Sequence, residues 1–359
     1  MEKDIKLFEE YYREQKKNLT KIIDDYNEEL VKENNKIVKE NLEYFKELNS
    51  NGKLIRGILV NLGYSLVKDN LDYSNYLALA YELFQTSILI HDDIIDNDNK
   101  RRGKDTVHYA NYKKYSIYND NKDEIKHLSN SIALCVGDYG LYLSNKVVID
   151  KYQNDSNLAK VLSNFNDTVL KTIKGEILDV VLPTISKDIG ISEADLEETI
   201  NNIYLLKTAH YTIIGPLSSG LILGSATSKK IDDITKFGEK VGVAFQIQDD
   251  ILGIFSNEMG KVKGSDIREF KQTILYSLVA KSDYKEELLK YYGKNKLTAK
   301  DISKVQEIFI KSEAKRQAEE VMNNLYDDSI KDINNIKWIS EDKKSLLRGF
   351  VYYLKNRNK

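Results

Sequence analysis

The chain has 359 residues, and its 54 basic and 56 acidic side chains nearly cancel, which leaves a formal net charge of -2. This balance gives no electrostatic reason to expect nucleic acid or an anionic membrane as a partner. The single cysteine, Cys135, excludes an internal disulfide and any cysteine-only zinc site. The N-terminus is charged, and no apolar run approaches the roughly 18–20 residues that are needed to span a bilayer. We therefore expect a cytoplasmic protein with no membrane span.

Apolar residues recur at three- and four-residue spacing almost throughout, which predicts amphipathic helices. Only two prolines and 18 glycines interrupt them, too few for an all-β plan with many tight turns. Because no Gly/Ser/Pro linker marks a boundary, we expect an all-α helical bundle in a single domain over residues 1–359. In chain order we expect a polar N-terminal helix that includes Leu7, apolar helices over 54–67, 76–95 and 131–148, irregular polar segments over 115–126 and 258–265, and packing helices over 311–359.

The most informative segment is the run His91-Asp92-Asp93-Ile94-Ile95-Asp96 at the end of the 76–95 helix. Asp92 and Asp96 are four residues apart, so on a helix their side chains project from the same face, one turn apart. These like charges repel unless a cation neutralises them, and carboxylate oxygens without thiols or imidazoles suit a hard ion such as magnesium. Taken alone, the motif fits a solvated acidic helix end equally well. An EF-hand fits worse, because Lys100 and Arg101 stand where a ligand and a glycine are required.

A second acidic pair, Asp249-Asp250, follows Gln246-Ile247-Gln248 in another helical pattern. Glycines in mid-helix each cost about 1 kcal/mol relative to alanine, so their presence needs a reason. Close helix packing is one explanation, and a face that leaves room for a ligand is another. We favour the ligand, because two polar side chains and three glycines recur on one face at three- and four-residue steps: Gly238, Gly242, Gln246, Asp249 and Gly253.

Cations cluster near both acidic motifs. Each one alone is most simply a surface charge, as lysines and arginines usually are. Together they supply what two diphosphates require, which is several fixed cations alongside acids that hold bridging metals. They occur in Gly52-Lys53-Leu54-Ile55-Arg56, Lys100-Arg101-Arg102-Gly103, Lys207-Thr208, Gly260-Lys261 and Arg268-Glu269-Phe270-Lys271.

With these motifs in this order, the chain resembles the trans-isoprenyl diphosphate synthases, the polyprenyl synthetase family that includes farnesyl and geranylgeranyl diphosphate synthases. The strongest matches are Leu89 to Asp96 with Arg101-Arg102-Gly103, and Phe245 to Asp250, within a motif-bearing core of about residues 52–271. The resemblance implies a single bundle of the isoprenoid synthase type with a central substrate cavity. It also implies a homodimer, two or three magnesium ions, and isopentenyl and allylic diphosphates as substrates.

The resemblance also assigns roles to individual residues. Asp92 and Asp96 would hold two magnesium ions on the allylic diphosphate with Asp93 nearby, and Asp249 would hold a third, supported by Asp250. Thr208 and Gln246 match the pair that lines the reacting carbons, and Lys207 is expected beside them with its backbone carbonyl facing the cation. The expected allylic diphosphate ligands are Arg101, Lys207, Lys261 and Lys271, and the expected isopentenyl diphosphate ligands are Lys53, Arg56, Gln85 and Arg102.

Three features depart from the family pattern. Gly253 stands where many members have a third aspartate, and we interpret it as a variant of the motif. Phe270 replaces the glycine that usually precedes the lysine matched by Lys271, which puts the geometry of that loop in question. The polar segment over 115–126 is longer than usual and has no role that we can assign.

The resemblance implies ionisation of the allylic diphosphate, attack by the isopentenyl double bond, and proton loss to the released diphosphate. Two other classes stay open. A class I terpene cyclase would need no isopentenyl site, which Lys53, Arg56 and Arg102 argue against. A non-catalytic subunit would be expected to have lost carboxylates from its acidic motifs, yet Asp92 and Asp249 are present.

Product length is expected to depend on the helix that carries Asp92. Ser87 lies about 7.5 Å before Asp92 along that helix and Phe84 about 12 Å before it. Bulky aromatics are absent at Ser87 and Ile88, which in this family resembles enzymes with a deeper pocket. Phe84 would then be the first large ring able to stop growth, which favours a twenty-carbon product, geranylgeranyl diphosphate.

Overall fold

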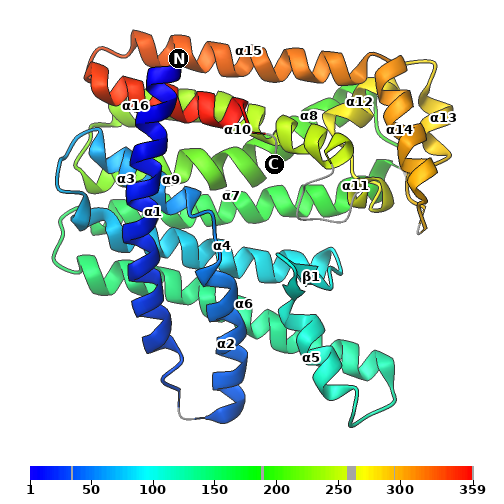
Figure 1. The fold of residues 1–359 in the computed structure, drawn as a ribbon, viewed down its shortest axis with the longest axis horizontal. Coiled ribbons are helices and arrows are strands. Elements are labelled where there is room, and N and C mark those ends of the chain that lie inside the picture. The colour runs from blue at the N-terminus through cyan, green and yellow to red at the C-terminus, as the bar shows by residue number, and fades with distance from the viewer. Residues whose placement is uncertain (34, 187–189, 257–263, 295, 358–359) are drawn as a thin grey trace. The chain divides into compact units, whose positions relative to one another are not determined.

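The computed structural model describes residues 1–33, 35–186, 190–256, 264–294 and 296–357. Helices dominate this part of the chain, and its only strands are two of two residues each, so the expectation of an all-α protein is confirmed (Figure 1). The elements are α1 Glu2–Leu30, α2 Lys36–Ser50, α3 Ile55–Ser65, η1 Leu71–Ser74, α4 Asn75–Ile95, β1 Lys100–Arg101, β2 Lys104–Asp105, α5 Val107–Tyr115, α6 Lys122–Tyr152, α7 Leu158–Thr184, α8 Glu193–Ile203, η3 Tyr204–Ile214, α9 Gly215–Leu223, α10 Ser228–Phe255, α11 Ser265–Arg268, α12 Ile274–Ala280, α13 Lys285–Leu289, α14 Ala299–Lys311, α15 Ala314–Asn335 and α16 Glu341–Lys355.

The chain groups into two compact units, which we describe separately. Unit 1 comprises Met1–Glu10, Asn164–Ser218 and Thr227–Lys359, and unit 2 comprises Tyr11–Ser163 and Ser219–Ala226. The single-domain organisation expected from the absence of a linker stays a prediction.

Unit 2 is built around α4, which packs against α6 and α3 (Figure 1). Most of α4 is buried, which explains why its sequence is apolar on nearly every face. At Gly140 of α6 an added Cβ would clash with the ring of Phe45 from α2, so only glycine allows these helices to approach. This packing fixes the end of α4, where the first acidic motif lies.

Unit 1 is built around α10, which packs against η3 and α15. An added Cβ at Gly242 would clash with Ala209 of η3, and one at Gly238 would lie 2.8 Å from Ile214. Two of the three glycines on this face therefore allow close helix packing. The expectation that the face leaves room for a ligand is wrong at Gly238 and Gly242, because η3 occupies that space.

Two expectations about irregular segments change. Residues 115–126 are less irregular than expected, because α6 already begins at Lys122, where Asn121 caps it by accepting a hydrogen bond from the Glu124 backbone N–H. The irregular segment expected over 258–265 lies mostly outside the described residues, and α11 begins at Ser265.

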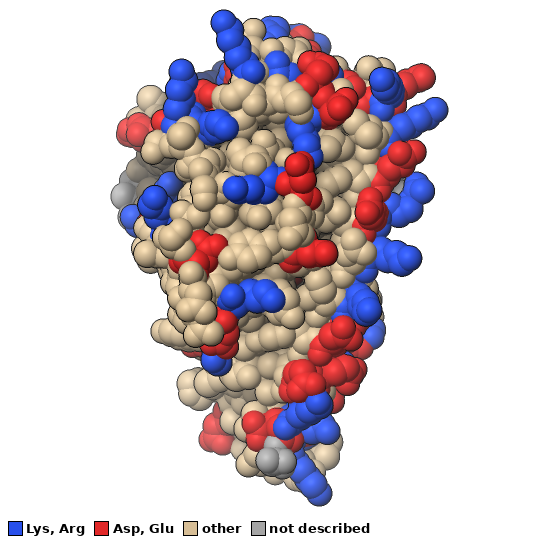
Figure 2. Space-filling view, turned by 90° about the vertical axis from the view of Figure 1, so that its left-hand side faces the viewer, with Lys and Arg blue, Asp and Glu red and all other residues tan. Residues whose placement is uncertain are grey.

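Among the described residues, one helix, α6, is long and apolar enough to cross a membrane by length and composition. A core helix of a soluble protein passes the same test, so this feature alone is weak support for a span. Polar residues interrupt the apolar run of α6, so the sequence alone did not indicate a candidate span there. On the face shown in Figure 2, Lys and Arg side chains alternate with Asp and Glu, and neither sign forms a large patch of its own.

Candidate active site

The first acidic motif lies where α4 stops. Asp96 is the C-cap residue, and its backbone N–H bonds to the Asp92 carbonyl at 2.8 Å, so the two aspartates stay one helical turn apart. Asn97 then adopts a left-handed conformation with φ 55°, and the Asp98 N–H closes back onto the Asp93 carbonyl at 2.9 Å. This is the Schellman arrangement, in which asparagine is a favoured residue at the left-handed position. The sequence thus ends the helix with its acidic side chains on the last turn.

The basic motif that follows forms a β-hairpin. Lys100 pairs with Asp105 and Arg101 with Lys104, which leaves Arg102 and Gly103 as a two-residue turn. Both turn residues have positive φ, 53° and 81°, as a type I′ turn requires. The glycine is therefore needed for the turn itself, and the turn directs the two arginines to different partners.

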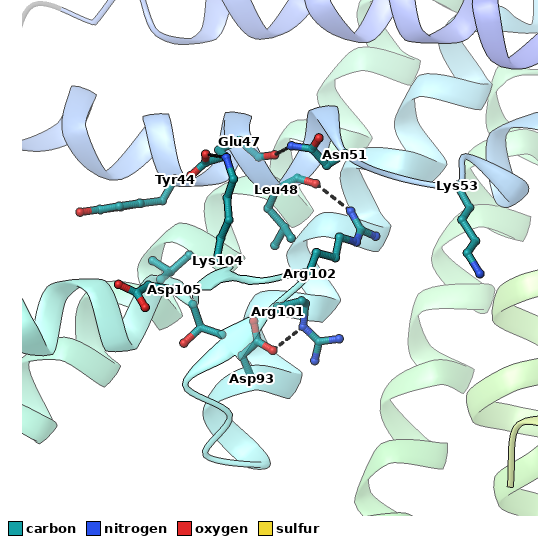
Figure 3. Close-up of a pocket in the computed structure, with 12 residues that line it drawn as sticks. Tyr44, Glu47, Leu48, Asn51, Lys53, Asp93, Arg101, Arg102, Lys104 and Asp105 are labelled. Carbon is teal, nitrogen blue, oxygen red and sulfur yellow. Dashed lines mark hydrogen bonds and ion pairs between the residues drawn. The ribbon is translucent and has the colours of Figure 1, made fainter. Parts of the chain in front are cut away.

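Arg101 turns back onto the acidic motif. Its guanidinium donates to the carboxylate of Asp92 at 2.9 Å and also to that of Asp93. Arg102 instead donates to the Leu48 carbonyl of α2 at 3.2 Å, as Figure 3 shows. Burial raises the pKa of Asp93 to about 7, while the charge of Arg101 pulls it down. A cation next to this carboxylate therefore favours its ionised form.

Asp93, Arg101 and Arg102 line a cavity of about 410 Å³ in unit 2 (Figure 3). Three of the expected diphosphate ligands meet there: Lys53, Arg101 and Arg102. Sequence reasoning did not identify Lys104, whose ammonium pairs with Glu47 on the rim. The arrangement is a cation-lined pocket beside a pair of carboxylates, which suits a phosphate-bearing ligand.

A buried glutamate supports two of the expected isopentenyl diphosphate ligands. The Glu82 carboxylate accepts the backbone N–H of Gly57 at 2.7 Å, in the first turn of α3, which also carries Arg56. Burial raises the pKa of Glu82, and the charges of Arg56 and Arg102 oppose that shift. Sequence reasoning missed Glu82, although a lone acid in the apolar α4 pattern is an available signal. Gln85 lies one turn further along α4 and is partly buried.

In unit 1 a hydrogen-bond chain connects the second acidic motif to η3. The Thr208 hydroxyl donates to the Gln246 side-chain oxygen at 2.5 Å, and the Gln246 amide donates to Asp250 at 2.8 Å. Asp250 also accepts the hydroxyl of Tyr204, and burial raises the pKa of Asp250 well above its usual value. The expected pair Thr208 and Gln246 is therefore in direct contact, and Tyr204 is a support that the sequence did not reveal.

Lys207 lies on η3, a π-helical segment, where the regular α-helical hydrogen-bond pattern is interrupted. Its ammonium pairs with Asp179 at 2.6 Å and with Glu176 at 2.8 Å, both on α7. An added Cβ at Gly175 would clash with the Lys207 backbone, so α7 and η3 touch at this glycine. Sequence reasoning did not identify these two acids, because they lie far from Lys207 in the sequence.

The loop that carries Lys271 shows how the chain tolerates Phe270. This residue has φ 57°, in the left-handed region that glycine adopts most easily. Its ring packs against Tyr276 and Tyr292, each with centroids 5.8 Å away, and this contact holds the strained conformation. Lys271 pairs with Glu269 at 3.1 Å. The remaining expected ligand, Lys261, lies outside the described residues.

Asp249 pairs with a residue that sequence reasoning missed, Arg357 after α16. Among the described residues, no three His, Cys, Asp or Glu side chains gather into a protein-only metal site. Magnesium is usually bound through one or two carboxylates and shares its other positions with water and substrate phosphates. Asp92 and Asp249, each already paired with a cation, fit that ligand chemistry.

Known proteins match both the sequence and the fold. The polyprenyl synthetase family model matches residues 35–309. A short chain isoprenyl diphosphate synthase of Methanocaldococcus jannaschii is 28% identical over 72% of each chain. A geranylgeranyl diphosphate synthase of Sulfolobus acidocaldarius is 26% identical over 86% of this chain and 88% of its own length. The solved structure of geranylgeranyl pyrophosphate synthase from Corynebacterium glutamicum, complexed with isoprenyl diphosphate and magnesium, is 25% identical with a TM-score of 0.84, covering 98% of this chain and 99% of that one.

The matched residues include both acidic motifs, the hairpin arginines and the Lys207-Thr208 pair. The chain belongs to the polyprenyl synthetase family. It is a prenyltransferase.

Proposed function

We propose that this chain condenses isopentenyl diphosphate head-to-tail with an allylic diphosphate in a magnesium-dependent reaction. The observation that carries the proposal is the hairpin after α4, which directs Arg101 to the Asp92 carboxylate and Arg102 to the Leu48 carbonyl, at a cavity that Lys53 also lines. A site for two diphosphates needs two such sets of cations, and a site for one does not. This distinction also favours a synthase over a terpene cyclase.

The residues have distinct parts in the proposed reaction. Lys53, Arg56, Arg102 and Gln85 hold isopentenyl diphosphate, while Arg101, Lys207, Lys261 and Lys271 hold the allylic diphosphate. Asp92, Asp96 and Asp249 hold magnesium, which when bound supplies charge stabilisation to the leaving diphosphate. Thr208 and Gln246 fix the reacting carbons, because each restrains the other through a 2.5 Å hydrogen bond. The proton leaves with the released diphosphate, so no side chain is assigned as the base.

We propose geranylgeranyl diphosphate as the product and two or three magnesium ions as the complement. Two of the three similar proteins above are geranylgeranyl diphosphate synthases, and the one that is a solved structure is complexed with isoprenyl diphosphate and magnesium. Phe84 is fully buried in α4, three turns before the end of the helix, which is compatible with a floor beneath the growing chain.

A homodimer is part of the proposal. Large apolar side chains are exposed along α6 at Leu134, Tyr139, Tyr142 and Ile149, which leaves apolar surface available for a partner. Sedimentation should give twice the monomer mass at micromolar concentration. A monomer there would contradict this part of the proposal and leave the chemistry untouched.

The test is incubation of the purified chain with isopentenyl diphosphate, magnesium and each allylic diphosphate in turn. We expect longer prenyl diphosphates, with twenty carbons as the main product. Hydrocarbon products formed without isopentenyl diphosphate would instead support a terpene cyclase. No turnover by this chain alone, with activity restored by a partner synthase, would support a non-catalytic subunit.

A further inference from the structure

Arg357 is built into the second acidic motif although it follows that motif by 108 positions. Its guanidinium donates to the Asp249 carboxylate, and its carbon centre lies 4.4 Å from the centroid of the Phe245 ring. The two charged side chains are only 17% and 29% exposed. The ion pair is therefore partly shielded from water and is covered on one side by an aromatic ring, which strengthens it relative to a surface pair.

The motif itself holds the arginine in place. The Gln248 side-chain amide donates to the backbone carbonyls of Lys355 at 3.3 Å and Arg357 at 3.1 Å. Its oxygen accepts the Tyr326 hydroxyl at 2.9 Å, and Gln248 is buried. Gln248 directly precedes Asp249 in the motif. Gln248 therefore holds the turn after α16 in place, and that turn positions Arg357 against Asp249.

We propose that Arg357 sets the affinity of Asp249 for divalent cations by occupying its carboxylate until the metal displaces it. A guanidinium and a divalent cation both need the same carboxylate oxygens, so the two compete. The free energy that holds Arg357 on Asp249 is then subtracted from the free energy of metal binding. The clamp by Gln248 maintains this competition, because it keeps the guanidinium close whenever the metal is absent.

The inference rests on the proposed function only in taking Asp249 as a metal ligand.

The experiment measures Mn²⁺ binding to the full chain without substrate, from the electron paramagnetic resonance signal of free Mn²⁺. Arg357→Gln should bind Mn²⁺ about three- to tenfold more tightly than the wild type, the range for losing a partly shielded ion pair. Gln248→Ala, which releases the turn and keeps the arginine, should shift binding in the same direction by less.

Lys355→Gln is the matched control, because Lys355 is on the same turn and pairs with Asp327 at 2.8 Å, not with a motif carboxylate. It should leave Mn²⁺ affinity unchanged, and an equal gain in this variant would mean general electrostatics and overturn the proposal. Asp249→Asn should weaken binding and remove the effect of Arg357→Gln. If Asp249→Asn weakens binding and Arg357→Gln does not tighten it, the competition is refuted and the metal assignment survives. If Asp249→Asn changes nothing, the metal assignment fails, and the inference with it.

Discussion

The cation on Asp92 comes from a residue nine positions further along the chain, whereas the cation on Asp249 comes from 108 positions away. In the first acidic motif, a Schellman stop and a two-residue hairpin bring Arg101 back onto the carboxylates. Short-range backbone geometry alone specifies that contact. In the second motif, the contact depends on the packing that brings the residues after α16 against α10.

Asp93 and Asp250, which follow Asp92 and Asp249 directly, also differ in whether their partners are local and charged. Asp93 is buried beside the local cation Arg101, and its pKa rises only to about 7. Asp250 is buried against Tyr204 and Gln246, both neutral, and its pKa lies well above the usual range. The first motif is thus a local charge cluster, and the second is one end of a neutral hydrogen-bonded network. Perturbation of distant packing should therefore affect the second motif more than the first.

The largest expected effect is loss of turnover on removing either aspartate that would hold metal. Asp92→Ala and Asp249→Ala should each lower kcat on the order of 10³-fold, because each removes charge stabilisation needed chiefly in the transition state. Product formation under saturating substrate measures the change, and circular dichroism checks that helix content is kept. Asp232→Ala, an exposed acid on α10, is the matched control and should retain full activity. Near-normal turnover in one variant would remove that motif from the metal site.

The next effect tests the two diphosphate sites that we propose. Arg102→Ala and Lys53→Ala should raise KM for isopentenyl diphosphate about 10- to 100-fold with little change for the allylic substrate, and Arg101→Ala should do the reverse. Steady-state kinetics with each substrate varied in turn provide the measurement. Lys104→Ala removes a cation from the same cavity and should affect neither substrate strongly. Equal effects of Arg102→Ala, Lys53→Ala and Arg101→Ala on both substrates would contradict the two-site assignment.

A smaller, qualitative effect concerns product length, which we expect to depend on α4 and not on α10. Phe84→Ala should lengthen the main product, and Ile88→Phe should shorten it. Ser87→Phe is a poorer test than Ile88→Phe, because Ser87 is fully buried and donates to the Gly137 carbonyl of α6. The control is Phe237→Ala, which removes an equally buried ring from α10. Chromatography of the products decides, and an unchanged distribution in both α4 variants would place the floor elsewhere.

Features encoded locally could be predicted from the sequence. The helix expected over 76–95 is α4, Asn75–Ile95, and the expected spacing of Asp92 and Asp96 survives at its end. Helical periodicity and the turn chemistry after it are properties of neighbouring residues, so one sequence contains them. The segment over 115–126 was misjudged, because its polar composition hid the cap at Asn121 that starts α6.

Features that depend on residues far apart in the sequence could not be predicted. Nothing near Lys207 in the sequence indicates Glu176 and Asp179, and nothing near Asp249 indicates Arg357. Phe270 was correctly identified as unusual, but its stabilisation by Tyr276 and Tyr292 requires the folded structure. The candidate site is therefore predictable as a set of charged motifs. The ion pair that Asp249 of the second motif forms with Arg357 could not be predicted.

The smallest expected effect tests the packing of η3, which supports the second motif, through its buried histidine. Burial and the charge of Lys171 lower the pKa of His210 to about 4. Between pH 6.5 and 4 the unfolded chain therefore binds a proton at this residue that the folded chain does not, so its contribution to stability is lost as pH falls through this window. Between pH 7 and pH 5, His210→Gln should remove about 2 kcal/mol of that dependence. Urea unfolding of both proteins at pH 7 and pH 5 gives the measurement, with His127→Gln, an exposed histidine on α6, as the control.

If wild type and His210→Gln lose the same free energy of unfolding on acidification, the buried histidine does not contribute to the pH dependence of stability. A smaller loss in the variant would mean that protonation of His210 accounts for part of the loss of stability in acid. In that case Asp249-dependent Mn²⁺ binding should fall with acid more in the wild type than in His210→Gln.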